Sequence, residues 1–413
     1  MQTFTLLFLI FLTITTLVQL WLSFRQLNHV AKHRSAVPEE FAGKISLAEH
    51  QKAADYTQAK GRFARIELII SVIILLLWTI GGGLNWLDQT IRSFGWSDLI
   101  TGTAVILAMG FISSLIDLPA NLYRTFVIEE KFGFNKQTLK SFFVDMIKTT
   151  LLSLVIGVPL ILLILWLMQF AGDWWWIYAW AALTLFSLLM MWAYPKFIAP
   201  IFNKFEPLEE GEVKQRIEDL LARTGFNSQG VFVMDGSRRS SHGNAYFTGF
   251  GANKRIVFFD TLLEHLSPAQ VEAVLAHELG HFKRKHILKQ MILSTVMTLI
   301  GFAILAWLMQ QNWFYSSMGV EKSVYMALIL FMLVSPVFTF FIGPIMSWLS
   351  RKNEFEADEF AAKQSSAEEL ITALVGLYKE NANTLTPDPL HSAFYDSHPP
   401  ASIRIAHLKK QSN

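Results

Sequence analysis

Two histidines and a glutamate at helical spacing carry the clearest chemical signal in the chain. Residues 268–286 read PAQVEAVLAHELGHFKRKH, and their apolar side chains recur with the period of a helix that follows a serine and begins at a proline. His277 and His281 stand four residues apart, so both imidazoles lie on one face, close enough to share one Zn²⁺. Glu278 is angled to reach a zinc-bound water rather than the metal itself.

A second pair at helical spacing could complete such a site. Residues 351–358 read RKNEFEAD, follow the last apolar run and continue as a predicted helix. Glu354 and Asp358 share a face, so Glu354 would complete a two-histidine, one-glutamate set with an open position for water. Asp358 could then hold a ligand imidazole in its tautomer. Glu356 points elsewhere and is interpreted as solvated. The histidine pattern alone arises by chance in about one per cent of such chains, so it needs this context.

A possible substrate-binding strand precedes the histidine helix. Two apolar, β-rich runs at 231–234 and 255–259 predict strands, and residues 241–250 between them read SHGNAYFTGF. Asn-Ala-aromatic leading into a strand is typical of the edge strand of thermolysin-like proteases, where a peptide adds by backbone pairing. An ordinary strand of a small sheet is the alternative. The residues predicted to bind substrate are Asn244, Ala245 and Tyr246.

Two residues near the end of the chain could take part in catalysis. His398 precedes a Pro-Pro pair, which holds its backbone extended, and near zinc it could stabilise a developing oxyanion. Arg404 could brace the site carboxylates or bind a substrate carbonyl. A solvated histidine in a tail is the alternative. The remaining histidines have no spacing argument and are interpreted as surface or interface residues: His29, His33, His50, His242, His265, His286, His391 and His407.

The composition requires that most of the chain lie in a membrane. Of 413 residues, 52% are hydrophobic and only 16% are charged, whereas soluble domains have about 25% charged residues. A solely soluble enzyme and a disordered chain are therefore excluded. The net charge of +2 is too small to indicate a nucleic-acid partner. The absence of cysteine excludes disulfides and a thiolate metal site.

Seven apolar stretches are long enough to span a bilayer. They lie at roughly 3–24, 66–84, 99–118, 149–170, 174–194, 288–310 and 323–349. Lys and Arg residues concentrate in alternate connections, which predicts an N-terminus outside the cell and a cytoplasmic C-terminus. The last two spans form a hairpin that leaves the histidine helix and returns to the Glu354 helix, so both lie at the cytoplasmic face. A receptor, channel or transporter is the alternative on topology alone.

The predicted fold class is a mainly α integral membrane protein: seven transmembrane helices with a small α+β gluzincin metalloprotease domain at the cytoplasmic face. We expect four segments. They are an N-terminal membrane domain with five spans (1–194), a zincin-like segment with the histidine helix (195–287), a transmembrane hairpin (288–349) and a C-terminal segment with the third zinc ligand (350–413).

Taken together, the motifs make a family resemblance recognisable. Residues 123–130 with 132–135, residues 194–204, the Glu354 segment, and His398-Pro-Pro with Arg404 match motifs along nearly the whole chain. The sequence resembles the integral-membrane CAAX prenyl endopeptidases, zinc proteases that also process the yeast a-factor precursor. The resemblance implies a water-filled chamber enclosed by the helices, with zinc near its rim, and a lipidated peptide or protein substrate. The chain's length and its ending in Lys409–Asn413 suggest a bacterial inner-membrane relative; a eukaryotic one would lie in the endoplasmic reticulum.

The resulting hypothesis is hydrolysis of a peptide bond by a metal-activated water. His277, His281 and Glu354 bind one Zn²⁺, and Glu278 takes the proton of the water and delivers it to the leaving amine. His398 and Arg404 stabilise the oxyanion, and the lipid bilayer is the other partner. Two alternatives stay open. One is a membrane-protein quality-control protease with the same chemistry, and the other is a non-enzymatic seven-span binding or transport protein with a vestigial site.

Overall fold

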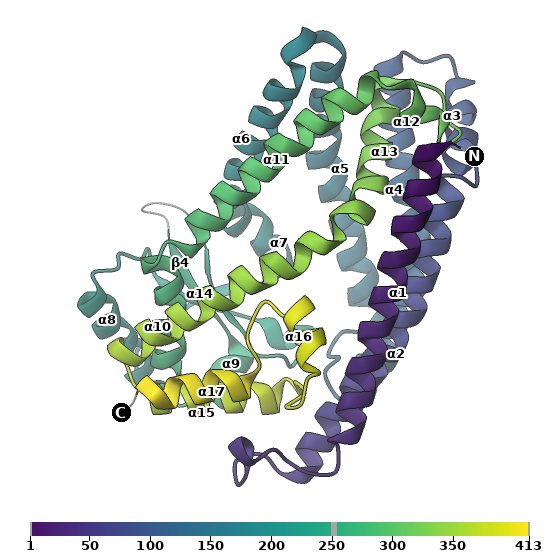
Figure 1. The fold of residues 1–413 in the computed structure, drawn as a ribbon. Helices are drawn as coiled ribbons and strands as arrows, with labels where there is room; N and C mark the ends of the chain where they lie inside the picture. The colour runs from purple at the N-terminus through teal and green to yellow at the C-terminus, as the bar shows by residue number, and fades with distance from the viewer. Residues whose placement is uncertain (1, 249–253, 412–413) are drawn as a thin grey trace.

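A tall group of apolar helices stands beside a smaller region of helices and one sheet (Figure 1). The structure is a computed structural model that describes residues 2–248 and 254–411. The strand motif noted at 241–250 therefore passes out of the described part at Gly249 and Phe250. The N-terminus lies at one end of the tall helices, and the C-terminus lies at the far corner of the smaller region.

Six helical runs in the described residues are long and apolar enough to cross a membrane. They are α1 (Thr3–Lys32), α4 (Asp98–Tyr123) with the π-helical turn η2 (Arg124–Glu129), α5 (Leu139–Phe170), the run Gly172–Phe202, α11 (His286–Gln310) and the run Val324–Gln364. The run Gly172–Phe202 contains η3 (Gly172–Trp174), α6 (Trp175–Ala193), η4 (Tyr194–Ile198) and α7 (Ala199–Phe202). A seventh candidate is the pair α2 (Leu47–Trp78) and α3 (Gly83–Arg92), bent by 50°. The expected seven spans therefore correspond to the upper count.

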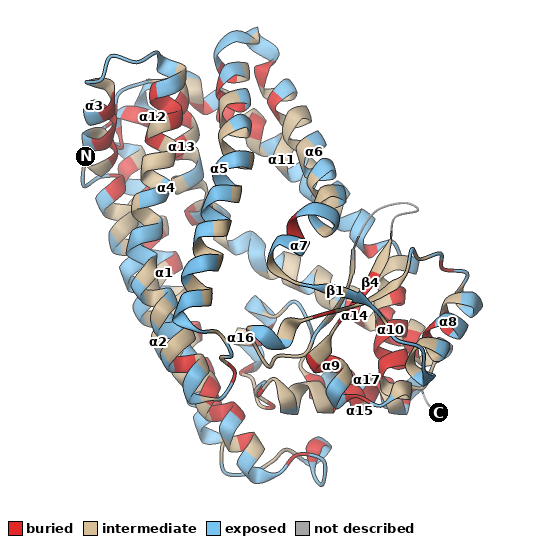
Figure 2. Cartoon of the chain, turned by 180° about the vertical axis from the view of Figure 1, so that it is seen from behind, coloured by how far each residue is buried: buried red, intermediate tan, exposed pale blue. Residues whose placement is uncertain are grey.

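The outward faces of these helices are apolar. Val155 on α5 is 72% exposed and Leu185 on α6 is 67% exposed, and Figure 2 shows exposed residues along the outer sides of both. A contiguous apolar surface of this extent is unfavourable in water and suits a bilayer. The internal core of this half is formed by residues such as Phe8, Val105 and Tyr325.

Two spans continue well past the apolar stretches that predicted them. The second was expected at 66–84, but α2 already begins at Leu47, so its first turns stand beside the smaller region. The last was expected at 323–349; it comprises α13 (Val324–Thr339), η6 (Phe340–Ile342) and α14 (Gly343–Gln364). A proline inside α13 and the Gly-Pro start of α14 account for the break, because proline removes a helical hydrogen bond. The third-ligand helix is therefore the end of the last membrane run.

The sheet has four strands in the order β1-β2-β4-β3. They are β1 (Phe205–Pro207), β2 (Val231–Met234), β3 (Ala245–Thr248) and β4 (Arg255–Phe259). Strands β2 and β4 pair in parallel, and β3 pairs antiparallel to β4. The two strands predicted from sequence are thus the central pair. Among the described residues, β3 has no neighbour on its outer side, so it is an edge strand.

The histidine helix α10 (Pro268–Lys283) lies in the smaller region with α8 (Glu212–Thr224), α9 (Asp260–His265), α15 (Ala367–Glu380), α16 (Pro389–Tyr395), α17 (Ala401–Gln411) and the short turn η5 (Gly236–Arg238). The short helix α12 (Asn312–Ser316) instead connects α11 and α13 at the far end of the membrane helices, and the turn η1 (Glu39–Phe41) lies between α1 and α2. Helix α10 is buried on several sides, with Val271, Leu275 and Leu279 all at most 1% exposed. It packs against α8, α14 and α15.

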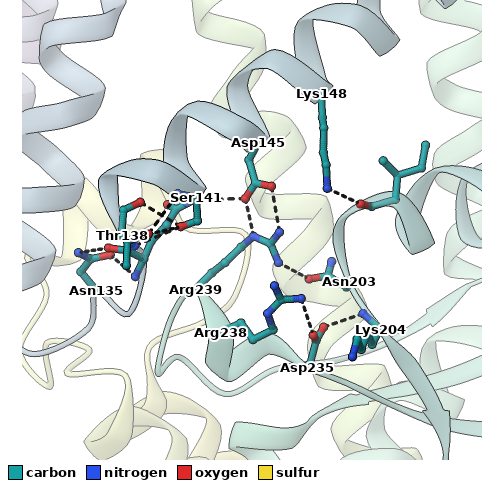
Figure 3. Close-up of polar contacts among 12 residues, drawn as sticks. Asn135, Thr138, Ser141, Asp145, Lys148, Asn203, Lys204, Asp235, Arg238 and Arg239 are labelled. Atoms are coloured by element: carbon teal, nitrogen blue, oxygen red, sulfur yellow. Dashed lines mark hydrogen bonds and ion pairs between the residues drawn. The ribbon is translucent and has the colours of Figure 1, made fainter.

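A polar joint connects the membrane helices to the loop that leads into β3 (Figure 3). Arg239 donates two hydrogen bonds to the carboxylate of Asp145 on α5, at 2.8 and 3.1 Å, and a third at 2.9 Å to Asn203. A backbone bridge between Asn135 and Ser240 adds to this connection. These contacts join the membrane helices to the smaller region, and the four-segment division of the chain stays a prediction.

Candidate metal centre and active site

Helix α10 presents its two histidines from a well-defined start. The Ser267 hydroxyl accepts a hydrogen bond from the backbone N–H of Gln270, and the side-chain oxygen of Gln270 accepts one from the backbone N–H of Ser267. Pro268 occupies the first helical turn, where its missing N–H costs nothing. This reciprocal cap fixes where the helix begins and hence which face His277 and His281 occupy.

A close helix crossing brings the third ligand to this face. A Cβ on Gly280 would lie 2.8 Å from the Cα of Ala357, so only glycine permits this approach of α10 to α14. Glu354, one turn before Ala357, consequently faces the two imidazoles. Its carboxylate oxygens lie 3.4 Å from Nε2 of His277 and 3.2 Å from Nε2 of His281.

The three side chains form a set that could hold one metal ion. One ligand atom from each of His277, His281 and Glu354 lies within 4.8 Å of the others. The two Nε2 atoms are 3.2 Å apart, and Oε2 of Glu354 is buried without a hydrogen bond. Buried lone pairs that converge in this way are costly unless a cation, either a proton or a metal ion, binds between them. The residues therefore fit the metal predicted for them.

Contacts made by the Nδ1 atoms of His277 and His281 explain why the Nε2 atoms of both rings face the metal site. Nδ1 of His277 lies 2.8 Å from Asp358, which accepts its hydrogen. Nδ1 of His281 lies 3.1 Å from Nδ1 of His286, and Nε2 of His286 lies 3.1 Å from Glu356. A consistent assignment of protons has His281 donating to His286 and His286 donating to Glu356. Both ligand rings then keep an unprotonated Nε2 for the metal.

The chain of contacts from His281 through His286 to Glu356 corrects two interpretations made from sequence. His286 is not a surface residue, because it is 4% exposed, and Glu356 is not merely solvated, because it holds that imidazole. His50 is likewise buried rather than superficial, at 1% exposed. No periodicity could have revealed His286. Lys285 has a left-handed backbone (φ 57°), which turns the chain between α10 and α11 and brings His286 back toward His281.

A buried arginine organises the carboxylates. Arg404 donates to both oxygens of Asp358, at 2.9 and 2.6 Å, and its guanidinium lies 3.6 Å from Glu354. Both partners of the first pair are buried, so the bidentate geometry is what makes the charges tolerable there. These contacts agree with bracing of the site carboxylates, one of the two roles predicted for Arg404, and the role itself stays a prediction.

The surroundings of His277 favour a cation at the site. Burial and the neighbouring Arg404 disfavour the protonated ring, but Asp358 and Glu354 outweigh them and raise its pKa to about 9. A metal ion that binds here near neutral pH therefore replaces a proton.

One member of the metal-ligand set, His277, lines a cavity of about 1100 Å³. His277, Glu278 and His398 line it, as do Asn244 and Ala245 at the start of β3. On the other side it is lined by α1 and α2. A cavity of this kind agrees with the chamber that the resemblance implied. Tyr246, also predicted to bind substrate, does not line it; its ring belongs to a small separate pocket with Phe232 and Val257.

His398 faces this cavity beside the ligand set. Its side chain is 63% exposed, and its Nε2 lies 3.4 Å from Glu354. The hydroxyl of Ser397 lies 3.0 Å from its Nδ1. The protein atoms around the cavity lower the pKa of His398 from its ordinary value, against the opposing charge of Glu354. The ring is therefore mostly neutral near pH 7, and with Ser397 donating to Nδ1 its proton sits on Nε2.

The edge strand offers backbone groups to an extended peptide. The carbonyl of Asn244 accepts from the backbone of Phe259 at 3.0 Å. Bonded and non-bonded pairs alternate along an antiparallel ladder, so the peptide groups of Ala245 and Phe247 face the open edge. The Asn244 side chain holds the Ala245 N–H at 2.8 Å.

Comparison with known proteins decides the family. Residues 26–204 match the family described as CAAX prenyl protease N-terminal, five membrane helices, and residues 207–412 match peptidase family M48. The chain belongs to the CAAX prenyl protease family. This protease is 34% identical to CAAX prenyl protease 1 homolog of Arabidopsis thaliana, covering 96% of this chain and 95% of the relative. It is also 34% identical to CAAX prenyl protease 1 of Saccharomyces cerevisiae, covering 94% and 91%.

A solved structure agrees over the whole fold. The crystal structure of Ste24p from S. mikatae superposes with a TM-score of 0.91 at 33% identity, covering 99% of each chain. The protein is therefore an integral membrane metallopeptidase with a five-helix N-terminal domain. The non-enzymatic alternative finds no support in this membership. The family implies a metal, and the group of His277, His281 and Glu354 is where the described residues could hold it.

Proposed function

We propose that this protease is a zinc endopeptidase that removes the C-terminal tripeptide from prenylated CAAX substrates. The observation that carries the proposal is the convergence of His277, His281 and Glu354, with His277 and Glu278 lining a large cavity that is also lined by the start of an edge strand. The names of its relatives, which are CAAX prenyl proteases, supply the substrate class. Two imidazoles and one carboxylate are a donor set that zinc prefers.

The chain's own residues account for the remaining chemistry. Bound zinc supplies a Lewis acid that polarises the scissile carbonyl and makes a water nucleophilic near neutral pH. The Glu278 carboxylate accepts the proton of the attacking water and delivers it to the leaving amine. The Nε2–H of His398 donates to the oxygen that gains negative charge. Arg404 acts through Asp358 and Glu354 as a positioning residue.

Substrate binding follows from the open edge of β3. An extended peptide pairs with the outward backbone groups of Ala245 and Phe247, with Asn244 beside the scissile bond. Tyr246 does not present its ring to the substrate, because that ring belongs to the other pocket. Its part in substrate binding is to keep β3 paired with β4. The prenyl group of the substrate remains close to the lipid bilayer, in which the protease itself is embedded.

The proposed topology places the N-terminus outside and the metal site on the cytoplasmic side. Its support is the alternation of basic connections, above all the cluster between α1 and the apolar part of α2 and the basic residues of 195–287. A bacterial inner membrane stays the prediction from sequence. Protease accessibility of tags at each end in sealed vesicles tests the orientation.

Purified protease offered synthetic peptides tests the function. The expected result is one zinc per chain by elemental analysis, and release of an intact tripeptide from a farnesylated CAAX peptide, identified by mass spectrometry. The unprenylated peptide and an unfolded membrane protein are the comparisons. Cleavage of the unfolded protein alone would overturn the proposed substrate class in favour of quality control. Absence of bound zinc in active enzyme would overturn the metal assignment.

A further inference from the structure

One lysine on the cavity wall makes no ion pair among the described residues. The cavity is lined by three Lys or Arg residues, Lys60, Arg65 and Arg404. Arg404 is paired with Asp358. Lys60, exposed into the cavity from α2, makes no ion pair with any described residue; its ammonium lies over the ring of Tyr56, 3.8 Å from the centroid. A cation enclosed by protein without a counter-ion favours binding of an anion.

A chain of contacts links Lys60 to the start of the edge strand. The hydroxyl of Tyr56 donates to Glu129 at 2.6 Å, and the other oxygen of Glu129 lies 3.5 Å from Nε2 of His242. The Asn381 side chain accepts from the backbone of Gly243 at 3.1 Å and lies 3.2 Å from Nδ1 of His242. Glu129 also attracts Lys60, but its two oxygens are engaged by Tyr56 and His242.

The direction of a bound peptide follows from the strand. A peptide antiparallel to β3, the commoner pairing, runs toward Ala245 and then past Asn244 and Gly243. Only the Ala245 end of β3 lines the cavity beside Glu278, so the scissile bond lies there. The residues on its C-terminal side therefore extend toward His242 and Lys60. Three extended residues cover about 10 Å.

We propose that the ammonium of Lys60 binds the C-terminal carboxylate of the substrate and so makes the enzyme specific for chain ends. The inference rests on the proposed function, because a tripeptide that leaves from the end of a chain carries that carboxylate. Lys60 supplies a charge-assisted hydrogen bond that an internal peptide segment could not receive.

Arg65 is the competing cation on the same wall. It lies five residues further along α2, about 7.5 Å along the helix axis. Its guanidinium lies over Phe24 of α1, 4.3 Å from the ring centroid, and it takes no part in the contacts that link Lys60 to His242. The structure therefore assigns the substrate carboxylate to Lys60, and the Arg65→Met variant tests the alternative.

The test compares two farnesylated CAAX peptides that differ only in ending with a free carboxylate or a carboxamide. Wild-type enzyme is expected to cleave the carboxylate peptide with about 10- to 100-fold higher kcat/KM, the size of a charge-assisted hydrogen bond. In Lys60→Met that ratio should fall close to one, and Lys60→Arg should restore part of it. Lys52→Met is the matched control, because Lys52 lies on the same helix, outside the cavity, over Phe134.

Binding of the product gives a second readout. The free tripeptide acid should inhibit wild-type enzyme about tenfold or more better than its amide, and Lys60→Met should lose this preference. Equal cleavage of both peptides by wild-type enzyme overturns the inference while leaving the proposed function intact. A ratio that survives in Lys60→Met but collapses in Arg65→Met also overturns it, in favour of Arg65. Cleavage of neither peptide removes the proposed function, and the inference with it.

Discussion

The Nδ1 atoms of His281 and His286 lie 3.1 Å apart, although the two residues belong to different helices. His286 is in turn held by Glu356, so the imidazole of His281 is oriented from behind through two side chains. Asp358 holds His277 directly. The two imidazoles of the metal-ligand set are thus held in different ways. Asp358 contacts His277 directly, whereas Glu356 orients His281 through His286.

Replacing His286 should weaken metal binding. His286→Phe keeps a buried ring but removes the partner of His281 Nδ1, and loss of such an outer partner lowers affinity about 10- to 100-fold. Competition with a chelator of known affinity measures it. His265→Phe, an exposed histidine at the end of α9, is the control. Equal zinc affinity in His286→Phe and wild type would show that the contact between His286 and His281 does not affect metal binding.

Glu278→Gln should remove catalysis and keep the metal. Glu278 lines the cavity and is not among the three clustered ligand groups, so the amide loses the general base without disturbing the metal-ligand set. We expect about a 10²- to 10⁴-fold fall in kcat with one zinc still bound. Turnover at the wild-type rate would exclude Glu278 as the base.

Arg404→Met should destabilise the fold. It leaves Asp358 charged and buried without its bidentate partner, and breaking a buried pair on one side costs about 3–5 kcal/mol. Denaturant unfolding in detergent measures the change. Arg216→Met is the control: its side chain is 41% exposed, and its removal leaves Glu212 exposed and Glu272 still paired with Arg223, so the stability should change much less. Equal effects of the two variants would contradict the burial argument.

Arg239→Ala should disturb substrate binding without removing the metal. Arg239 ties α5 to the loop that leads into β3 (Figure 3), and small displacements of a positioned substrate can cost about 100-fold in rate. We expect kcat/KM to fall about 10-fold or more with full zinc content. Its neighbour Arg238, whose side chain bonds within the described residues only to Asp235 of the same turn, provides the matched Arg238→Ala control. A loss of zinc in Arg239→Ala would instead indicate a general structural role.

The sequence alone determined those features that depend on neighbours along one element. His277 and His281 share a face because a helix repeats every 3.6 residues, and the same period pairs Glu354 with Asp358. The central strands β2 and β4 were legible as apolar β-rich runs, and the apolar stretches located the membrane runs. The family motifs were also readable, since they are short and local.

Only the tertiary structure decided how those elements meet. The crossing at Gly280 and Ala357 brings Glu354 to the histidines, and the left-handed turn at Lys285 brings back His286. The extension of α2 beyond its apolar part places Lys60 on the cavity wall. The physical reason is that spacing within a helix or strand fixes directions over a few residues. Distances between elements depend instead on packing among many side chains, which no single segment of the sequence records.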